Sequence, residues 1–115
     1  MRRGEIRLVG FDPSVGSEAA KRRPAVIVSN DRLNSTALRL GRGVVTVVPV
    51  TSNVERVFPF QILLPATDTG LAVDSKAQAE QVRAVDVARI GRRAGVVPAS
   101  LMAELDDALR LHLDL

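Results

Sequence analysis

Two segments of the sequence place a phosphate-binding type of side chain at the end of an apolar run. Arg23 stands directly before Pro24 in RRPAVIVS, and Thr51 follows the β-branched run in VVTVVPVTS. A guanidinium donates two parallel hydrogen bonds to a phosphate, and a hydroxyl can donate another. If the two segments are neighbouring strands, Arg23 and Thr51 meet at one rim and form a phosphate site.

The strands that must position these side chains are expected at Pro24–Ser29 and Val44–Val50. Pro24 has no backbone N–H and suits the first residue of a strand, while Pro49 indicates a sheet edge or a bulge near the end of the second segment. Other strand-like segments are Glu5–Phe11, Phe58–Leu64, Ser75–Gln81, Val82–Val85 and Gly95–Val97.

Helices are expected in three places. Asn30 and Asp31 can cap a short helix over Asp31–Leu38, which the glycines at 41 and 43 end. Asp86–Ile90 is long enough for a single helical turn. From Pro98 onward, apolar residues recur with the spacing of one helical face. That stripe consists of Leu101, Leu105, Ala108, Leu109 and His112. The pattern predicts a mainly β fold, a small twisted barrel with an amphipathic C-terminal helix packed against it.

Composition limits the classes of function. The 115 residues suit one compact domain. The net charge is +3, with fourteen Arg and two Lys, which indicates either an anionic partner or a genome rich in Arg codons. The absence of Cys excludes disulfides and thiolate metal sites and agrees with a reducing cytoplasm. We expect no signal peptide and no contact with a membrane, because no apolar run approaches the length of a span.

Candidates for proton transfer are few. There is one His, and no carboxylate pair has a persuasive spacing, so no metal site and no cofactor are expected. His112 falls on the leucine stripe and is expected to be a structural or solvent-edge residue. Glu18 and Glu80 are the available carboxylates, and Arg stays protonated in proteins. Lys21, Arg22, Arg42, Arg56 and Arg83 either face water or line a path for an anionic ligand.

Four motifs in order carry a resemblance over nearly the whole chain. They are a GEI start leading to DPxxGSE, then RRPAVIVSN, VVPVTS and AEQVRAVD, followed by the C-terminal helix. This arrangement resembles the MazF/PemK toxins of bacterial toxin–antitoxin pairs. The resemblance implies an SH3-like small barrel of the MazF/PemK/CcdB type over residues 1–115. It also implies a homodimeric, cytoplasmic endoribonuclease that cuts single-stranded RNA without a metal ion and is blocked by an acidic MazE-like antitoxin.

The resemblance also implies roles for individual residues. The catalytic Arg and Thr of the family fall on Arg23 and Thr51, and the acidic residue used as a candidate base in the plasmid-borne branch falls on Glu80. The remaining matches are expected to bind RNA: Gly16, Ser17, Glu18, Ser52, Gln78 and Gln81.

Three positions depart from the family pattern. Arg7 stands where many members have Trp or Tyr, Gly10 where an acidic residue is common, and Gln78 where the plasmid-borne branch has Arg. Arg23 and Thr51 are unaffected by these departures.

Two other functions are compatible with the same architecture. A toxin of this fold can poison a protein target such as DNA gyrase, and a barrel of this kind can bind RNA without cutting it. A matched Arg and Thr favour the nuclease, because a mere binding protein does not need them.

Overall fold

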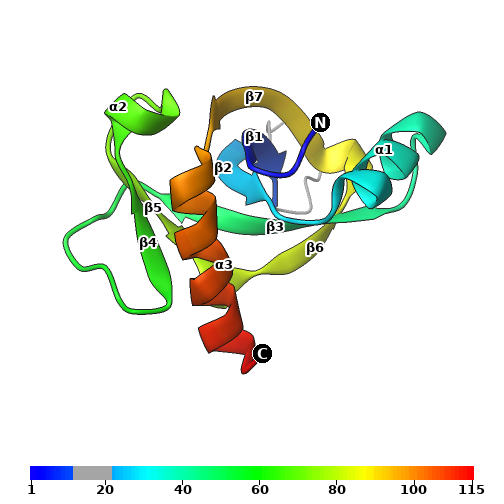
Figure 1. Cartoon of the computed structure of the whole chain (residues 1–115). Coiled ribbons are helices and arrows are strands. Elements are labelled where there is room, and N and C mark those ends of the chain that lie inside the picture. Colours follow the sequence, from blue (N-terminus) through cyan, green and yellow to red (C-terminus); the bar gives the residue numbers. More distant parts are fainter. Residues whose placement is uncertain (12–21) are drawn as a thin grey trace.

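The computed structural model describes residues 1–11 and 22–115. Within these residues, one curved antiparallel sheet of seven strands forms the body, and helices lie around it (Figure 1). The strands are β1 (Glu5–Gly10), β2 (Arg22–Ile27), β3 (Val44–Thr51), β4 (Gln61–Leu64), β5 (Ser75–Gln78), β6 (Arg83–Asp86) and β7 (Ile90–Val96). The α-helices are α1 (Asp31–Leu40), α2 (Ala66–Thr69) and α3 (Ala99–Leu113), and the 3₁₀ turns are η1 (Ala79–Gln81) and η2 (Val87–Arg89).

The sheet has the order β4–β5–β3–β2–β1–β7, with β6 also paired to β3. β3 is therefore internal: β2 pairs with one of its edges, while β6 and then β5 pair with the other. Of the two alternatives predicted near Pro49, a sheet edge or a bulge, the sheet edge is wrong. Pro49 lies where β3 changes partner, between Val47, the last residue paired to β6, and Val50, the first paired to β5. A residue without a backbone N–H is tolerated at this break in the ladder.

The predicted mainly β fold with an amphipathic C-terminal helix is confirmed, with shifts in several boundaries. The strand expected over Phe58–Leu64 begins only at Gln61, because a turn precedes it in which the Gln61 N–H donates to the Phe58 carbonyl at 2.9 Å. The strand expected over Ser75–Gln81 ends at Gln78 and continues as η1. The four-residue helix α2 was not predicted.

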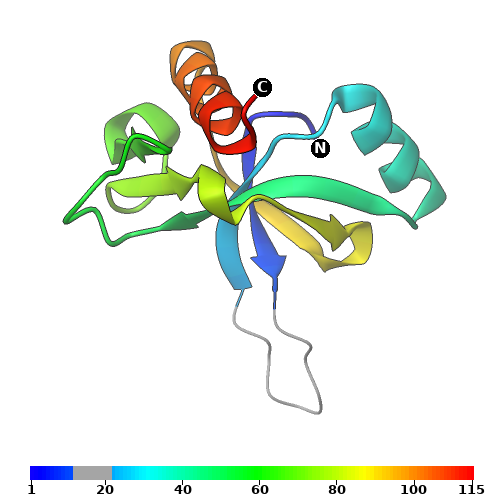
Figure 2. The ribbon, with the colours of Figure 1, turned by 90° about the horizontal axis from the view of Figure 1, so that it is seen from below.

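Two apolar clusters form the core, one on each side of the curved sheet. Both are aliphatic, as a sequence with three Phe and neither Trp nor Tyr requires. The first cluster joins the sheet to α3 and includes Ile6, Val26, Val48, Leu64 and Leu105. The second lies beneath α1 and includes Val9, Ile27, Ala37, Val45 and Val47. Figure 2 shows α3 (orange to red) and α1 (cyan) lying apart from each other over different parts of the sheet.

The helix ends follow their sequence signals. The Asn30 Oδ1 accepts a hydrogen bond from the Leu33 N–H at 2.8 Å, and Gly41, with φ +65°, ends α1. Pro98 is the N-cap of α3 rather than its first helical residue. Met102, Leu105 and Ala108 form the buried face of α3, whereas His112 is exposed. His112 is thus a solvent-edge residue.

The described part of the chain holds no helix that is long and apolar enough to cross a membrane.

Candidate functional site

The ends of β2 and β3 diverge around a cavity. Their ladder ends at the pair Ala25–Pro49, beyond which β3 pairs with β5. At Arg23 and Pro24, β2 has only β1 as a ladder partner. Pro24 cannot donate a backbone hydrogen bond. It lies where the second edge of β2 has no partner strand, so no donor is needed there. Arg23 is consequently held at the mouth of the strand with its side chain exposed.

The cavity has a volume of about 570 Å³, and its lining includes five polar side chains. These are Arg23, Thr51, Ser52, Ser75 and Arg92. The other lining residues are mostly aliphatic: Leu8, Pro24, Val50, Gly70, Leu71, Ala72, Val73 and Ala94. A lining that combines two guanidinium groups, three hydroxyls and aliphatic residues suits the two parts of a nucleotide, a charged phosphate and an apolar base face.

The hydroxyl of Thr51 is oriented by the chain that follows it. Its Oγ1 accepts a hydrogen bond from the Asn53 backbone N–H at 3.2 Å. A hydroxyl has one proton to donate and two lone pairs to accept with. With one lone pair engaged, the Thr51 O–H remains available to a ligand in the cavity.

Arg23 and Arg92 bring positive charge to the cavity. Within residues 1–11 and 22–115, no carboxylate lies at ion-pair distance from either guanidinium. Arg92 was missed in the sequence because its strand was expected to begin later. The sequence did contain a signal. Successive side chains of a strand point to opposite faces of the sheet, so Arg92 and Arg93 had to face opposite sides.

The other predicted site residues are distributed as follows. Ser52 lines the cavity with Arg23 and Thr51, whereas Gln78, Glu80 and Gln81 do not. The Glu80 Oε2 accepts a hydrogen bond from the Gln61 Nε2 at 2.8 Å, and its Oε1 is buried without a partner among residues 1–11 and 22–115. The predicted roles of these residues stay predictions. Gly16, Ser17 and Glu18 lie outside the described residues.

The described residues do not offer a metal site, since no group of three or more His, Asp or Glu side chains is close enough to hold an ion. In the same residues, neither a His nor a carboxylate lines the cavity. The chemistry available there is charge stabilisation and hydrogen-bond donation toward an anion.

Arg7 occupies the position at which many resembling sequences have an aromatic residue. Its Nε donates to Glu5 Oε1 at 2.9 Å, and one terminal nitrogen donates to the Gly91 carbonyl at 3.1 Å. Burial raises the pKa of Glu5, but the hydrogen bond and charge of Arg7 outweigh that effect and hold the pKa below its usual value. Arg7 thus stabilises the contact between β1 and β7.

Residues 2–113 match the family model described as "PemK-like, MazF-like toxin of type II toxin-antitoxin system". The chain belongs to this family. A curated relative from Mycobacterium tuberculosis (strain ATCC 25618 / H37Rv), "Endoribonuclease MazF9", is 64% identical over 115 residues, covering 100% of this chain and 98% of the relative.

Solved structures of MazF-like proteins have the same fold. The crystal structure of MazF from Deinococcus radiodurans superposes with a TM-score of 0.77 at 28% identity, covering 100% of this chain and 97% of that one. An endoribonuclease from a mycobacterial species, in complex with its cognate antitoxin, gives a TM-score of 0.76 at 20% identity, covering 100% and 96%. The MazF-like fold predicted from the sequence is therefore confirmed.

Proposed function

We propose that this MazF-like toxin is a metal-independent endoribonuclease that cuts single-stranded RNA at the cavity between β2 and β3. The observation that carries the proposal is the presence of Arg23, Thr51 and Arg92 in the lining of one cavity. The endoribonuclease class agrees with the activity in the name of the relative that is 64% identical over the full length of this chain.

The reaction is an internal displacement on the RNA. The 2′-oxygen forms a bond to the adjacent phosphorus while the bond from phosphorus to the 5′-oxygen breaks. The 2′-OH loses its proton and the leaving 5′-oxygen gains one. The products are a 2′,3′-cyclic phosphate and a 5′-OH, and no water needs to be activated.

Arg23 and Thr51 stabilise the charge that grows on the phosphoryl oxygens in this step. The fork of Arg23 contacts two oxygens, and the Thr51 O–H, already oriented by Asn53, donates to a non-bridging or leaving oxygen. Arg92, on the same cavity lining, contacts the scissile phosphate or the next one along the strand.

Among the described residues, the cavity lining supplies charge stabilisation and hydrogen-bond donors, and no His or carboxylate belongs to it. Glu80, the base implied by the resemblance, lies away from the cavity lining, and His112 is exposed on α3. Cleavage should therefore be independent of His112.

We further propose that the toxin acts in the cytoplasm as a homodimer and is inhibited by an acidic antitoxin. Two-fold pairing places two such cavities beside one shared groove. The net charge of +3, with fourteen Arg, supports an acidic partner, as does the structure of a similar endoribonuclease with its cognate antitoxin.

The test is incubation of purified protein with single-stranded RNA in excess EDTA, followed by analysis of the ends. We expect fragments with 2′,3′-cyclic phosphate and 5′-OH ends, from the wild type and equally from His112→Ala. Intact RNA, or fragments with 5′-phosphate, would contradict the proposal.

A further inference from the structure

Helix α1 exposes large aliphatic side chains at one end of the molecule. That end lies opposite the β3–β4 loop, the segment 52–60 that joins these two strands (Figures 1 and 2). Only Asn34 and Ala37 of the helix are buried. Four large aliphatic residues of α1 and the start of β3 keep between 42% and 57% of their surface exposed: Leu33, Leu38, Leu40 and Val44. Single exposed leucines are ordinary, but this many on one short helix and the strand after it indicate an interaction surface.

Leucine and arginine repeat along α1 with the spacing of a heptad. Leu33 and Leu40 lie about two turns apart on one side of the helix. Arg32 and Arg39 precede them by one residue each, and Thr36 lies between the two leucines on the same side. These residues occupy positions a, d and g of a heptad. In paired helices, a and d face the partner, while the charges at g select which partner is accepted.

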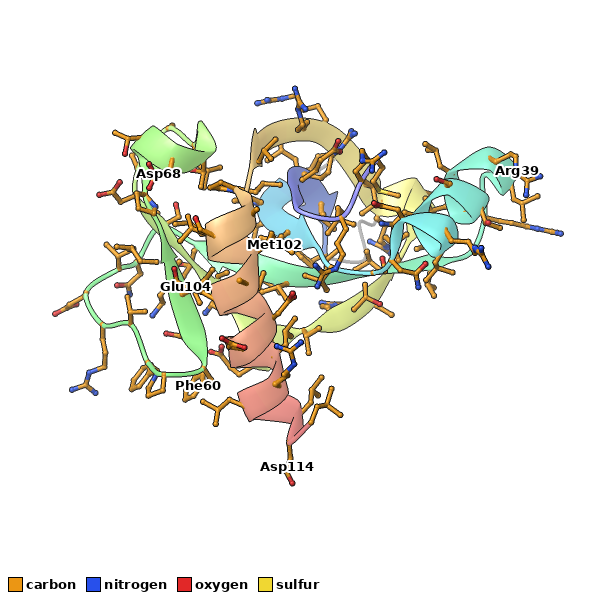
Figure 3. The ribbon with its side chains drawn as sticks, viewed as in Figure 1. Arg39, Phe60, Asp68, Met102, Glu104 and Asp114 are labelled. Atoms are coloured by element: carbon orange, nitrogen blue, oxygen red, sulfur yellow. The ribbon has the colours of Figure 1, made fainter. Side chains whose placement is uncertain are left out.

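The exposed side of α1 carries positive charge. Within residues 1–11 and 22–115, no carboxylate lies at ion-pair distance from Arg32, Arg39 or Arg42. The acidic residue of the same helix, Asp31, already accepts a hydrogen bond from the Arg3 backbone N–H at 2.6 Å. Figure 3 shows Arg39 at the outer end of α1, away from the body of the sheet. The surface therefore suits a partner of negative charge.

The helix is fixed to the sheet, so this surface exists before a partner arrives. Ala37 packs into the second apolar cluster. The fully buried Asn34 donates from its Nδ2 to the Ser29 carbonyl at 2.8 Å, and the Ser29 Oγ accepts from the Thr46 N–H at 3.0 Å. A helix that is already ordered loses less conformational entropy when it binds.

Charge and side-chain type distinguish between the possible occupants. A second copy of the helix would bring arginine side chains against arginine side chains, and like charges repel. Single-stranded RNA stacks on aromatic rings, of which α1 has none. An acidic amphipathic helix fits both features, because its apolar side chains cover the leucines and its carboxylates meet the arginines.

We propose that α1 is a docking site for an acidic amphipathic helix of another protein, separate from the cavity between β2 and β3. Apolar side chains of the partner cover Leu33 and Leu40, and its carboxylates pair with Arg32 and Arg39. The contact spans little more than one heptad, so the complex is transient. The inference does not depend on the nuclease function, since no residue of α1 lines that cavity.

The first test measures the binding of two synthetic peptides by fluorescence anisotropy. Both have about 18 residues, enough to form a helix in water, with leucine at heptad positions a and d. One carries Glu at positions e and g, and the other carries Lys. The Glu peptide should bind the wild type, with a Kd that rises with salt, and the Lys peptide should bind at least about tenfold more weakly. Equal binding of the two peptides, or binding of neither, overturns the proposal.

The second test uses variants to locate the contact. Leu33→Ser should raise the Kd of the Glu peptide by about tenfold, because an apolar side chain leaves the contact. Arg32→Glu should weaken the Glu peptide by a similar factor and strengthen the Lys peptide. It should not unfold α1, since an acidic residue is favourable in the first turn of a helix.

The matched controls are Leu115→Ser, an exposed leucine at the end of the chain, and Arg93→Glu, an exposed arginine on β7. Both should bind the two peptides as the wild type does. Wild-type affinity for both peptides in Leu33→Ser and Arg32→Glu would overturn the proposal.

The remaining outcomes identify a different occupant and also overturn the proposal. They are self-association that Leu33→Ser abolishes, binding of phosphatidylserine vesicles or single-stranded RNA that Arg32→Glu abolishes, and loss of affinity for the antitoxin in either variant. Both variants should cut RNA at the wild-type rate, and slower cutting by a folded variant would contradict a separate site. A protein that binds the Glu peptide as described but cuts no RNA contradicts the nuclease function alone.

Discussion

Arg23 and Thr51 line the same cavity, just beyond the last pair of the β2–β3 ladder, Ala25 with Pro49. The two prolines mark this point for a physical reason. Pro24 and Pro49 cannot donate backbone hydrogen bonds, so each fits where a strand loses or changes a partner. The opening between the strands is thus built into the sequence next to the residues that use it.

The hydroxyl of Thr51 can be tested by removal without a change of shape. Thr51→Val keeps the volume but removes both the donor to the phosphate and the acceptor for the Asn53 N–H. We expect the single-turnover rate to fall by about 10- to 1000-fold, which is the order of the rate loss when one hydrogen-bond donor to a developing oxyanion is removed. Thr51→Ser restores the hydroxyl and should recover most of the rate. A Thr51→Val enzyme as fast as the wild type would remove Thr51 from the mechanism.

Gly95 positions the apolar wall of the cavity. A Cβ at this residue would lie 2.5 Å from the Thr69 carbonyl oxygen, directly before Gly70 and Leu71 of the cavity lining. Gly95→Ala should destabilise the fold by about 1–3 kcal/mol through overpacking and slow cleavage by displacing that wall. Urea denaturation and single-turnover cleavage measure the two effects. Val96→Ala, an exposed neighbour on β7, should change neither; equal behaviour of the two variants would contradict the tight contact at Gly95.

Arg7, paired with Glu5 on the same strand, should stabilise the contact of β1 with β7 through its hydrogen bond to the Gly91 carbonyl. Both side chains are mostly buried, with 23% and 14% exposed, and their closest atoms are 2.8 Å apart. Arg7→Ala leaves the Glu5 carboxylate without its main partner and should lower the free energy of unfolding by about 1–3 kcal/mol. The double variant Arg7→Ala/Glu5→Gln should lose less than the sum of the single variants. Strict additivity in urea denaturation would show that the two residues do not interact.

Asp31 makes stability depend on pH at the start of α1. The Arg3 backbone N–H donates to its Oδ1 at 2.6 Å, and this bond, with the nearby charges of Arg2 and Arg3, lowers the pKa of Asp31 below 3.8. Because the folded form holds the proton less tightly, the stabilisation is present above pH 3.8 and is lost as the pH falls through the lowered pKa. The difference in Tm between pH 6 and pH 3 should therefore be smaller for Asp31→Asn than for the wild type. An identical difference in both proteins would contradict the assignment.

Local signals in the sequence predict the parts of the fold that short-range chemistry decides. Asn30 and Gly41 mark the two ends of α1 in the sequence, because capping depends on a few neighbouring residues. The apolar run of Val44–Val50 predicts β3 because β-branched residues favour strands wherever they are buried. Leu105 and Ala108 predict the buried face of α3 from their spacing alone.

What the sequence does not predict depends on contacts between distant segments. Pro49 alone predicts a sheet edge or a bulge, and only the order of the strands shows that β3 is internal with two partners on one side. Arg92 enters the cavity because β7 begins at Ile90, earlier than its glycines indicate. Phe58 belongs to a loop rather than to β4, and that loop is held from a distant strand by Lys76 of β5, whose Nζ donates to the Arg56 carbonyl.

The most direct test of the central claim is the single-turnover rate of RNA cleavage in EDTA for variants of Arg23. We expect the single-turnover rate of Arg23→Ala to be about 100- to 1000-fold lower than that of the wild type. Its thermal stability should be unchanged, because the exposed side chain of Arg23 has no structural partner in the described part of the chain. Arg23→Lys should recover only part of the rate, since an ammonium cannot form the two-pronged contact with phosphate. Arg39→Ala, on α1 at the far end of the molecule from the β3–β4 loop (Figure 3), should cut like the wild type. A folded Arg23→Ala protein that cuts RNA at the wild-type rate would contradict the account.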